Sequence, residues 1–150
     1  MRKGQKTQIR GATMYIQPAA ELIKKHEGLR LKPYKCTAGK TSIGYGRNLE
    51  DNGISQYEAE QMLFNDIQRC YTELVKLPCW NKLNEARKAV LLDMCYNLGI
   101  TRLKTFKKML AALEDGAYNR AAKEMVASKW ADQVKTRSTE LAQIMKTGEL

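Results

Sequence analysis

The segment from Glu27 to Arg47 constrains the fold of this chain more than any other. Pro18 suits the first position of a helix because it lacks the amide hydrogen that would be unbonded there. Gly28 can adopt the left-handed backbone conformation that often ends a helix. The sequence therefore predicts a helix over 18–27, with the carboxyl of Glu27 in its last turn.

A β-hairpin is predicted directly after this helix. Apolar and basic residues alternate over 29–33, as in an extended strand, and Pro33 restricts this arm to the edge of a sheet. Residues 37–40 have the composition of a turn, and 41–46 form the return strand. The hairpin should place a thiol on one arm and hydroxyls on the other.

Side chains alternate across the return strand. Ser42 shares one face with Gly44 and Gly46, whereas Thr41 and Ile43 point to the other face. Because glycines leave their face bare, we expect room for a ligand beside the Ser42 hydroxyl.

The spacing Glu27-x8-Cys36-x5-Ser42, followed by Ile-Gly-Tyr-Gly, resembles the active-site segment of the phage-type lysozymes, the endolysin muramidases. Members of that family have Glu, then Asp or Cys nine positions on, then Thr six further. The resemblance covers about residues 14–150. Two departures are Ser42 in place of the usual Thr, with Thr41 as an alternative source of the hydroxyl, and Arg47 where many members have His.

The resemblance implies a hydrolase that cuts peptidoglycan between N-acetylmuramic acid and N-acetylglucosamine. Such a reaction needs a proton for the leaving oxygen and a second group on the other face of the sugar. Glu27 would be the general acid, and Cys36 would either activate water or attack the anomeric carbon, with Ser42 helping to hold the water. Lys32 and Lys35 are expected to lower the pKa of the Cys36 thiol. The alternative for Cys36 is an inert, half-buried strand thiol.

Two residues of the second half also gain roles from the resemblance. Arg137 corresponds to an arginine that approaches the catalytic glutamate and holds it. Tyr96 corresponds to an aromatic that contacts the sugar, although a core tyrosine with a satisfied hydroxyl is an equal alternative.

The predicted fold class is α+β, mostly helical. A capping box at 55–58 begins a long helix over 56–77, and an apolar helix from Asn84 to Gly99 should be the buried hub of a helical lobe. Three further helices are expected at 106–114, 118–127 and 136–145. The resemblance implies a lysozyme-like domain over 14–150. Its parts are a small lobe at 27–55, a linking helix at 56–77, and a helical lobe at 81–150 together with the helix 18–27, preceded by a basic mobile tail at 1–13.

The net charge of +10 favours contact with polyanions, so functions other than hydrolysis are also considered. One alternative is a non-catalytic basic helical module that binds nucleic acid or an anionic wall polymer, although no recognition motif is present. Membrane disruption by a cationic helix is a weaker alternative. We expect bacterial peptidoglycan as the partner, no nucleic acid, no stable membrane insertion, and a monomer.

The four cysteines lack C-x-x-C spacing and His26 is the single histidine, so no metal or other cofactor is expected. The N-terminal residues lack the apolar segment of a signal peptide. We therefore expect the chain to wait in the host cytoplasm and to reach the wall, in the periplasm, through a pore made by another protein.

Overall fold

The computed structural model describes the backbone of residues 5–150 and the side chains from Met14 onward. The chain divides into two compact units, with the boundary between Ala59 and Glu60. About two thirds of the chain is helical (69%), and a three-stranded antiparallel sheet lies in the first unit. The predicted α+β class, mostly helical with a small sheet near the N-terminus, is confirmed.

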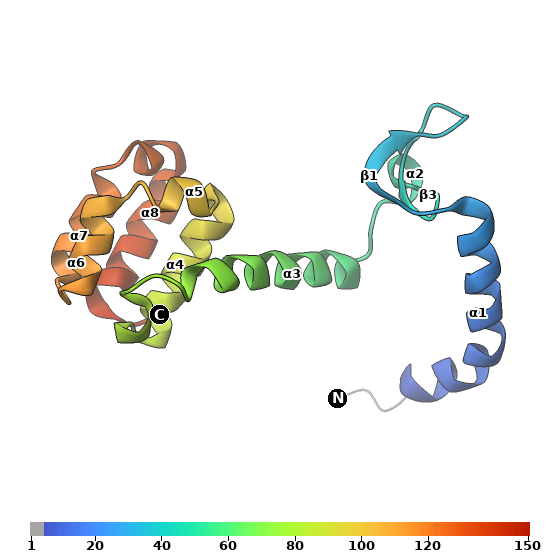
Figure 1. Cartoon of the computed structure of the whole chain (residues 1–150), viewed down its shortest axis with the longest axis horizontal. Helices are drawn as coiled ribbons and strands as arrows, with labels where there is room; N and C mark the ends of the chain where they lie inside the picture. The colour runs from blue at the N-terminus through green and yellow to red at the C-terminus, as the bar shows by residue number, and fades with distance from the viewer. Residues whose placement is uncertain (1–4) are drawn as a thin grey trace. The chain divides into compact units, whose positions relative to one another are not determined.

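The first helix is longer than predicted. α1 spans Gln5–Glu27 and contains Pro18, so the expected start at Pro18 is wrong (Figure 1). Proline removes only one helical hydrogen bond, and the residues before it include strong helix formers. Most of the stretch expected as a mobile tail thus belongs to α1, and residues 1–4 lie outside the described part of the chain. The predicted end is confirmed, since Gly28 has φ +71° and its N–H donates to Lys24 O at 3.0 Å.

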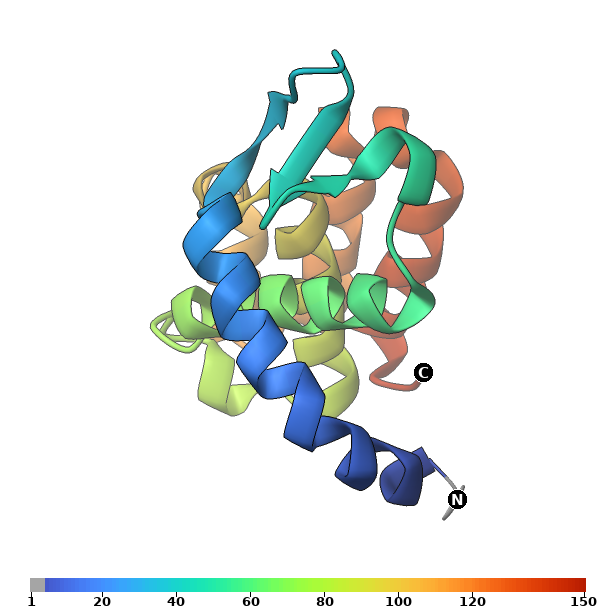
Figure 2. The same ribbon diagram turned by 90° about the vertical axis from the view of Figure 1, so that its right-hand side faces the viewer.

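The sheet has the order β1-β2-β3, built from β1 (Arg30–Lys35), β2 (Thr41–Gly44) and β3 (Arg47–Asn48). Figure 2 shows β1 and β2 as the two arms of the predicted hairpin. Pro33 lies in β1, at the edge of the sheet, as expected for a residue that cannot donate to a neighbouring strand.

Two short elements follow the hairpin. β3 pairs with β2, and α2 (Leu49–Asn52) follows at once. Asn48 caps α2, because its side-chain Oδ1 accepts from Asp51 N at 3.1 Å. An Asp-Asn-Gly sequence favours turns, but the Asn48 cap and the pairing with β2 organise the residues before Gly53.

The predicted capping box is confirmed at the start of α3 (Gln56–Leu74). The Ser55 hydroxyl accepts from Glu58 N at 3.2 Å, and Ser55 N donates to Glu58 Oε2 at 2.8 Å. α3 ends three residues before the predicted residue 77, and tight turns follow in which Leu77 N donates to Leu74 O at 3.0 Å.

The second unit is a helical bundle around α4 (Glu85–Leu98). The predicted N-cap is confirmed, since Arg87 N donates to Asn84 Oδ1 at 3.0 Å, and Gly99 follows the last residue of α4 as expected. The other elements are η1 (Trp80–Lys82), α5 (Ile100–Leu103), α6 (Lys107–Glu114), α7 (Tyr118–Val126) and α8 (Lys129–Thr147). The short α5 was not predicted.

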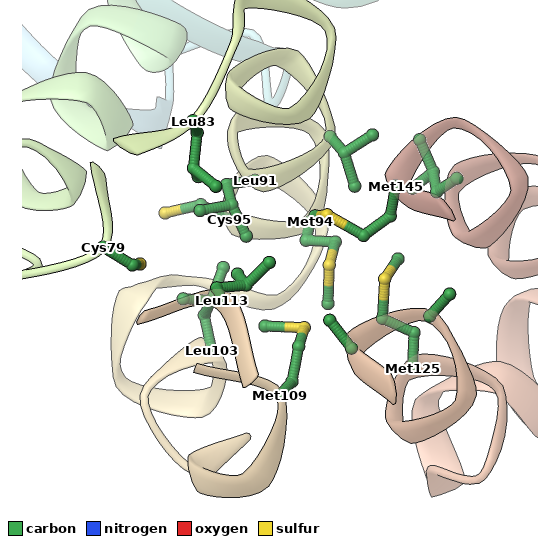
Figure 3. Packing of buried hydrophobic residues seen from close by; sticks show 14 of the residues in the cluster. Cys79, Leu83, Leu91, Met94, Cys95, Leu103, Met109, Leu113, Met125 and Met145 are labelled. Atoms are coloured by element: carbon green, nitrogen blue, oxygen red, sulfur yellow. The ribbon is translucent and has the colours of Figure 1, made fainter. Parts of the chain in front are cut away.

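The core of this unit confirms α4 as the buried hub. Figure 3 shows Met94 of α4 among Met109, Met125 and Met145, which come from α6, α7 and α8, and each of the four has no exposed surface. Methionine fills irregular gaps because it is unbranched and polarisable. Four helices thus share a close-packed centre.

α8 begins earlier than the predicted residue 136. Ser128 caps it by accepting from Ala131 N at 3.2 Å, and Trp130 in its first turn is buried, with its indole N–H donating to Asn97 Oδ1 at 2.8 Å. Val134 interrupts the helix with φ −121° and ψ 24°. The predicted helix therefore corresponds to the part of α8 beyond this interruption.

Candidate active site

The carboxyl group of Glu27 lies against Gly46. Glu27 is the last residue of α1, and Gly46 follows β2 with φ +85°. A Cβ placed on Gly46 would lie 3.0 Å from Glu27 Oε2, so only glycine leaves the carboxylate its present position. The hairpin backbone therefore packs on the predicted acid within the first unit. Sequence spacing alone did not indicate this contact.

Cys36 occupies the start of the hairpin turn. Its N–H donates to Lys40 O at 2.9 Å, and its carbonyl accepts from Gly39 N at 2.8 Å. Hydrogen bonds to the thiol from the backbone N–H of Lys40, then of Ala38, and from the Ser42 hydroxyl lower the pKa of Cys36 below its ordinary value of 9.0. The turn itself thus favours the thiolate.

The expected effect of Lys35 on Cys36 is wrong. Lys35 Nζ lies 2.7 Å from Thr41 Oγ1 and 3.0 Å from Glu50 Oε1, so its charge is directed at the carboxylate of Glu50. Lys32 is also absent from the groups that shift the thiol pKa. Backbone amides, which carry no formal charge, stabilise the thiolate instead.

The structure distinguishes the two candidate hydroxyls. The Thr41 hydroxyl donates to Glu50 Oε1 at 2.8 Å. The Ser42 hydroxyl donates to Lys40 O at 3.4 Å, and it is Ser42 that contributes to the lowered pKa of Cys36. Ser42 is only 1% exposed because β2 is the central strand, paired on both sides. The expected open space beside Ser42 is therefore not present. Open space lies instead at Gly44, where no atom comes within 4 Å of the place that a Cβ would occupy.

Two carboxylates hold the hairpin in place through contacts that sequence reasoning did not indicate. Glu50 accepts from Thr41 N at 2.8 Å and from Lys35, and these hydrogen bonds lower its pKa to about 2. Glu58 forms an ion pair with Arg47 at 2.5 Å. This ion pair, together with the hydrogen bond from the Ser55 amide, lowers the pKa of Glu58 to about 2. Arg47 therefore ties β3 to the start of α3.

A hollow of about 510 Å³ lies on the hairpin beside this arrangement. Gly46, which touches Glu27, is part of the wall of this hollow. The other wall residues come from β2 and the segment after it and are Ile43, Gly44, Tyr45, Arg47, Leu49 and Ile54. Tyr45 and Ile54 leave large parts of their side chains exposed. A wall of mixed polarity that carries the exposed ring of Tyr45, next to an acid, suits the face of a sugar ring.

Tyr96 and Arg137 both belong to the second unit and line one hollow of about 360 Å³. Tyr96 is 45% exposed, which excludes the alternative of a core tyrosine. Arg137 Nε donates to Asp93 Oδ1 at 2.7 Å, and Asp93 lies three positions before Tyr96 on α4. Asp93 was not predicted, because an acid on a helix gives no signal of a partner that lies 44 positions later in the sequence.

Among the side chains from Met14 onward, no group of three or more His, Cys, Asp or Glu residues is placed to hold a metal ion. In the described part of the chain, no helix combines the length and the hydrophobicity needed to cross a membrane.

Comparison with known proteins identifies the class of this fold and site. Residues 24–143 match the family described as phage lysozyme. An endolysin of Acyrthosiphon pisum secondary endosymbiont phage 1 is 34% identical over 130 residues, which covers 83% of this chain and 86% of the endolysin. A probable T4-type lysozyme of Dictyostelium discoideum is 26% identical over 165 residues, or 90% of this chain and 97% of that protein.

A third relative places the same domain in a larger protein. The pre-baseplate central spike protein Gp5 of Enterobacteria phage T4 is 29% identical over 87% of this chain, and the chain spans only 28% of its length. These similarities define a glycoside hydrolase of the lysozyme class. Within that class, the chain belongs to the phage lysozyme family.

Proposed function

We propose that this protein is a muramidase that cuts the glycan strand of peptidoglycan between N-acetylmuramic acid and N-acetylglucosamine, and that it serves as an endolysin in host cell lysis. The observation that carries the proposal is the carboxyl group of Glu27 held against Gly46, in the same unit as a thiol of lowered pKa. The endolysin relative, which the chain matches over most of both lengths, supports the biological role.

Glu27 acts as the general acid in this proposal. A glycosidic bond breaks readily only if the leaving oxygen receives a proton as the bond lengthens. The carboxyl group lies against Gly46, and the adjoining hollow offers a wall for the sugar. Positioning of this kind lowers the barrier because the donor is already oriented when the substrate arrives.

Cys36 acts from the other side of the sugar. A thiol works as a base or as a nucleophile only as its thiolate, and the turn amides raise the thiolate fraction near neutral pH. As a base, Cys36 would deprotonate a water that attacks the anomeric carbon, with inversion of configuration. As a nucleophile it would form a thioglycosyl intermediate and retain the configuration. We favour water activation, which is what the resemblance to the phage-type lysozymes implies.

Tyr96 and Arg137 complete the proposal from the second unit. We propose that the exposed ring of Tyr96 contacts the sugar, since it lines a hollow with apolar walls. The role of Arg137 in holding Glu27 stays a prediction from the family. In the structure its guanidinium binds Asp93.

We further propose that the protein acts as a monomer without nucleic acid, and that it reaches the wall after release through a pore formed by another protein. The match to an endolysin supports action on the cell wall.

The direct test of the proposal is the chemistry of the products. Purified peptidoglycan would be digested, reduced with borohydride and analysed by mass spectrometry, which labels the sugar at each new reducing end. A muramidase yields reduced N-acetylmuramic acid. Reduced N-acetylglucosamine would show a glucosaminidase and contradict the proposed bond. An absence of new reducing ends, together with duplex DNA binding that survives moderate salt, would favour the basic binding module instead.

A further inference from the structure

A single carboxylate oxygen binds both ends of the turn that carries Cys36. Glu50 Oε1 accepts from Thr41 N at 2.8 Å, from the Thr41 hydroxyl at 2.8 Å and from Lys35 Nζ at 3.0 Å. Lys35 directly precedes Cys36 in the sequence, and Thr41 directly follows the turn, which covers 36–40. One side chain from α2 therefore spans the base of the turn. We call these three contacts the Glu50 clamp.

The pairing of the hairpin arms explains why both ends are within reach of one side chain. Lys35 and Thr41 form the last antiparallel pair of β1 and β2 before the turn. The turn then closes with two backbone hydrogen bonds, from Cys36 N to Lys40 O at 2.9 Å and from Gly39 N to Cys36 O at 2.8 Å. Cys36 thus lies in a tight loop whose geometry depends on how closely its two ends are held.

Glu50 continues the sheet where β3 ends. β3 has only two residues, and its pairing with β2 covers Ser42 and Ile43, one residue short of Thr41. The N–H of Thr41 donates to the carboxylate of Glu50. A hydrogen bond from a backbone amide to a carboxylate is charge-assisted, and it is stronger than one to a neutral carbonyl. The carboxylate therefore takes the place of a strand partner at the base of the turn.

α2 is itself held beside the hairpin. Asn48 Oδ1 accepts from Asp51 N at 3.1 Å, and Asn48 Nδ2 donates to Asp51 Oδ2 at 2.8 Å, which closes the first turn of the helix. Lys40 Nζ donates to Asp51 Oδ1 at 3.2 Å, a second link between α2 and the hairpin turn. Glu50 therefore projects from a short helix that is capped and tied to the turn.

The Glu50 clamp carries its charge at any pH at which a thiol ionises. The hydrogen bonds from Thr41 N and then from Lys35 lower the pKa of Glu50 to about 2. The charged groups near this carboxylate are Lys35, Lys40 with its Nζ 3.9 Å from Oε2, and Asp51, the next residue of α2. Glu50 stays ionised throughout the titration of Cys36, so the clamp persists there.

We propose that Glu50 is a positioning residue for Cys36, because by holding Lys35 and Thr41 together it keeps the turn closed and fixes the backbone from which the thiol projects. The inference deepens the proposed function, since it rests on Cys36 as the second catalytic group. Glu50 touches no reacting atom in this account and acts only through the turn.

The thiol should respond if the turn opens. Its pKa is lowered by the backbone of Lys40 first and of Ala38 next, and both residues belong to the turn. Opening would move these groups away, so the pKa of Cys36 should rise toward its ordinary value of 9.0. Loss of a nearby negative charge acts in the opposite direction, because one anion disfavours another beside it. The direction of the shift therefore separates a clamp from a simple charge effect.

The test uses the full chain with Glu50→Ala, which removes the charge and the acceptor together. The half-maximum of iodoacetamide labelling at Cys36 should move upward by roughly half to one pH unit. The amide hydrogen of Cys36, which donates to Lys40 O, should exchange about tenfold faster, as measured by NMR. With peptidoglycan, kcat should fall roughly tenfold with little change in KM, because a reacting group is misplaced and the sugar is not.

Glu58→Ala is the matched control. Glu58 has the same lowered pKa of about 2 and lies in the same unit, but its partners are Arg47 and Ser55. Its loss should leave the labelling profile of Cys36 in place. Glu50→Gln covers the case in which Glu50→Ala does not fold. It keeps an oxygen that can accept from Thr41 N, so it should shift the profile upward by a smaller amount.

The outcomes separate this inference from the proposed function. A half-maximum that stays in place or moves downward in a folded Glu50 variant would overturn the inference, as would parent-like exchange of the Cys36 amide. A shifted thiol with an unchanged kcat would also overturn the positioning role. A parent that releases no reducing ends would instead contradict the proposed function, and labelling and exchange would still decide whether Glu50 holds the turn.

Discussion

The carboxylate of Glu27 and the backbone of Gly46 are in such close contact that a Cβ at position 46 would come within 3.0 Å of Oε2. The glycine also has φ +85°, a conformation that side-chain-bearing residues rarely adopt. Gly46 therefore serves two purposes: it adopts a backbone conformation with positive φ, and it leaves space for the Glu27 side chain. Any residue larger than glycine would disturb both.

Gly46→Ala should therefore reduce wall hydrolysis at least tenfold and destabilise the fold by about 1–2 kcal/mol, because the methyl group displaces Glu27 and the backbone is strained. Gly53→Ala is the control. It has φ +58° and nothing within 4 Å of the added carbon, so it should cost stability without a matching loss of activity. Reducing-end assays and urea unfolding measure the two effects. Equal activity losses in both variants would contradict the role of the contact.

The Cys36 thiol should titrate below its ordinary pKa of 9.0, because backbone amides and Ser42 stabilise the thiolate. The rate of iodoacetamide labelling at Cys36, followed by peptide mass spectrometry, should reach its half-maximum below pH 9.0. Ser42→Ala removes one of these hydrogen bonds and should move the half-maximum upward. An unchanged profile in Ser42→Ala would show that the serine does not contact the thiol in solution.

Acid should weaken the fold in a defined range. Glu50 and Glu58 have pKa values of about 2 in the folded protein, against 4.5 for an ordinary glutamate. Since the folded values are lowered, their contribution is present above about pH 4.5 and is lost as the pH falls toward 2. Urea unfolding from pH 7 to pH 2 measures it. Glu50→Gln should flatten this part of the profile, and a parent-like profile in that variant would contradict the assignment.

The helical unit should depend strongly on Met94. Its side chain has no exposed surface and lies among three other methionines, so Met94→Ala should destabilise the protein by about 3 kcal/mol through lost burial and a cavity. Met62→Ala, at a methionine 56% exposed on α3, should cost less than about 1 kcal/mol. Thermal and urea unfolding compare the two. Similar losses would show that the core is not centred on Met94.

Local signals in the sequence predicted much of the fold. The glycine after Glu27, the proline of the edge strand, the Ser55 capping box and the apolar α4 each produced the expected structure, because each acts over a few neighbouring residues. Helix boundaries were less accurate. Pro18 is tolerated inside α1, and Ser128 starts α8 before the interruption at Val134.

The candidate site was predicted in its residues and less well in its contacts. Spacing placed Ser42 and Cys36 on facing arms, and the structure brings them together. It did not reveal that Glu50 would engage Lys35, or that Asp93 would bind Arg137. Such pairs join side chains that are distant in sequence, and the sequence does not indicate which opposite charge a given residue will contact.

The role of Glu27 as the acid is tested most directly by the rate at which Glu27→Gln releases reducing ends from purified peptidoglycan, compared with the parent and with Glu21→Gln. Glu21 is an exposed acid of the same helix that pairs with Lys24, so its change controls for a lost charge. We predict that Glu27→Gln keeps the parent's circular dichroism and loses at least a hundredfold in rate, as expected when a general acid is removed, while Glu21→Gln hydrolyses the wall as the parent does. Parent-like hydrolysis by Glu27→Gln would contradict the assignment of this carboxyl group as the proton donor.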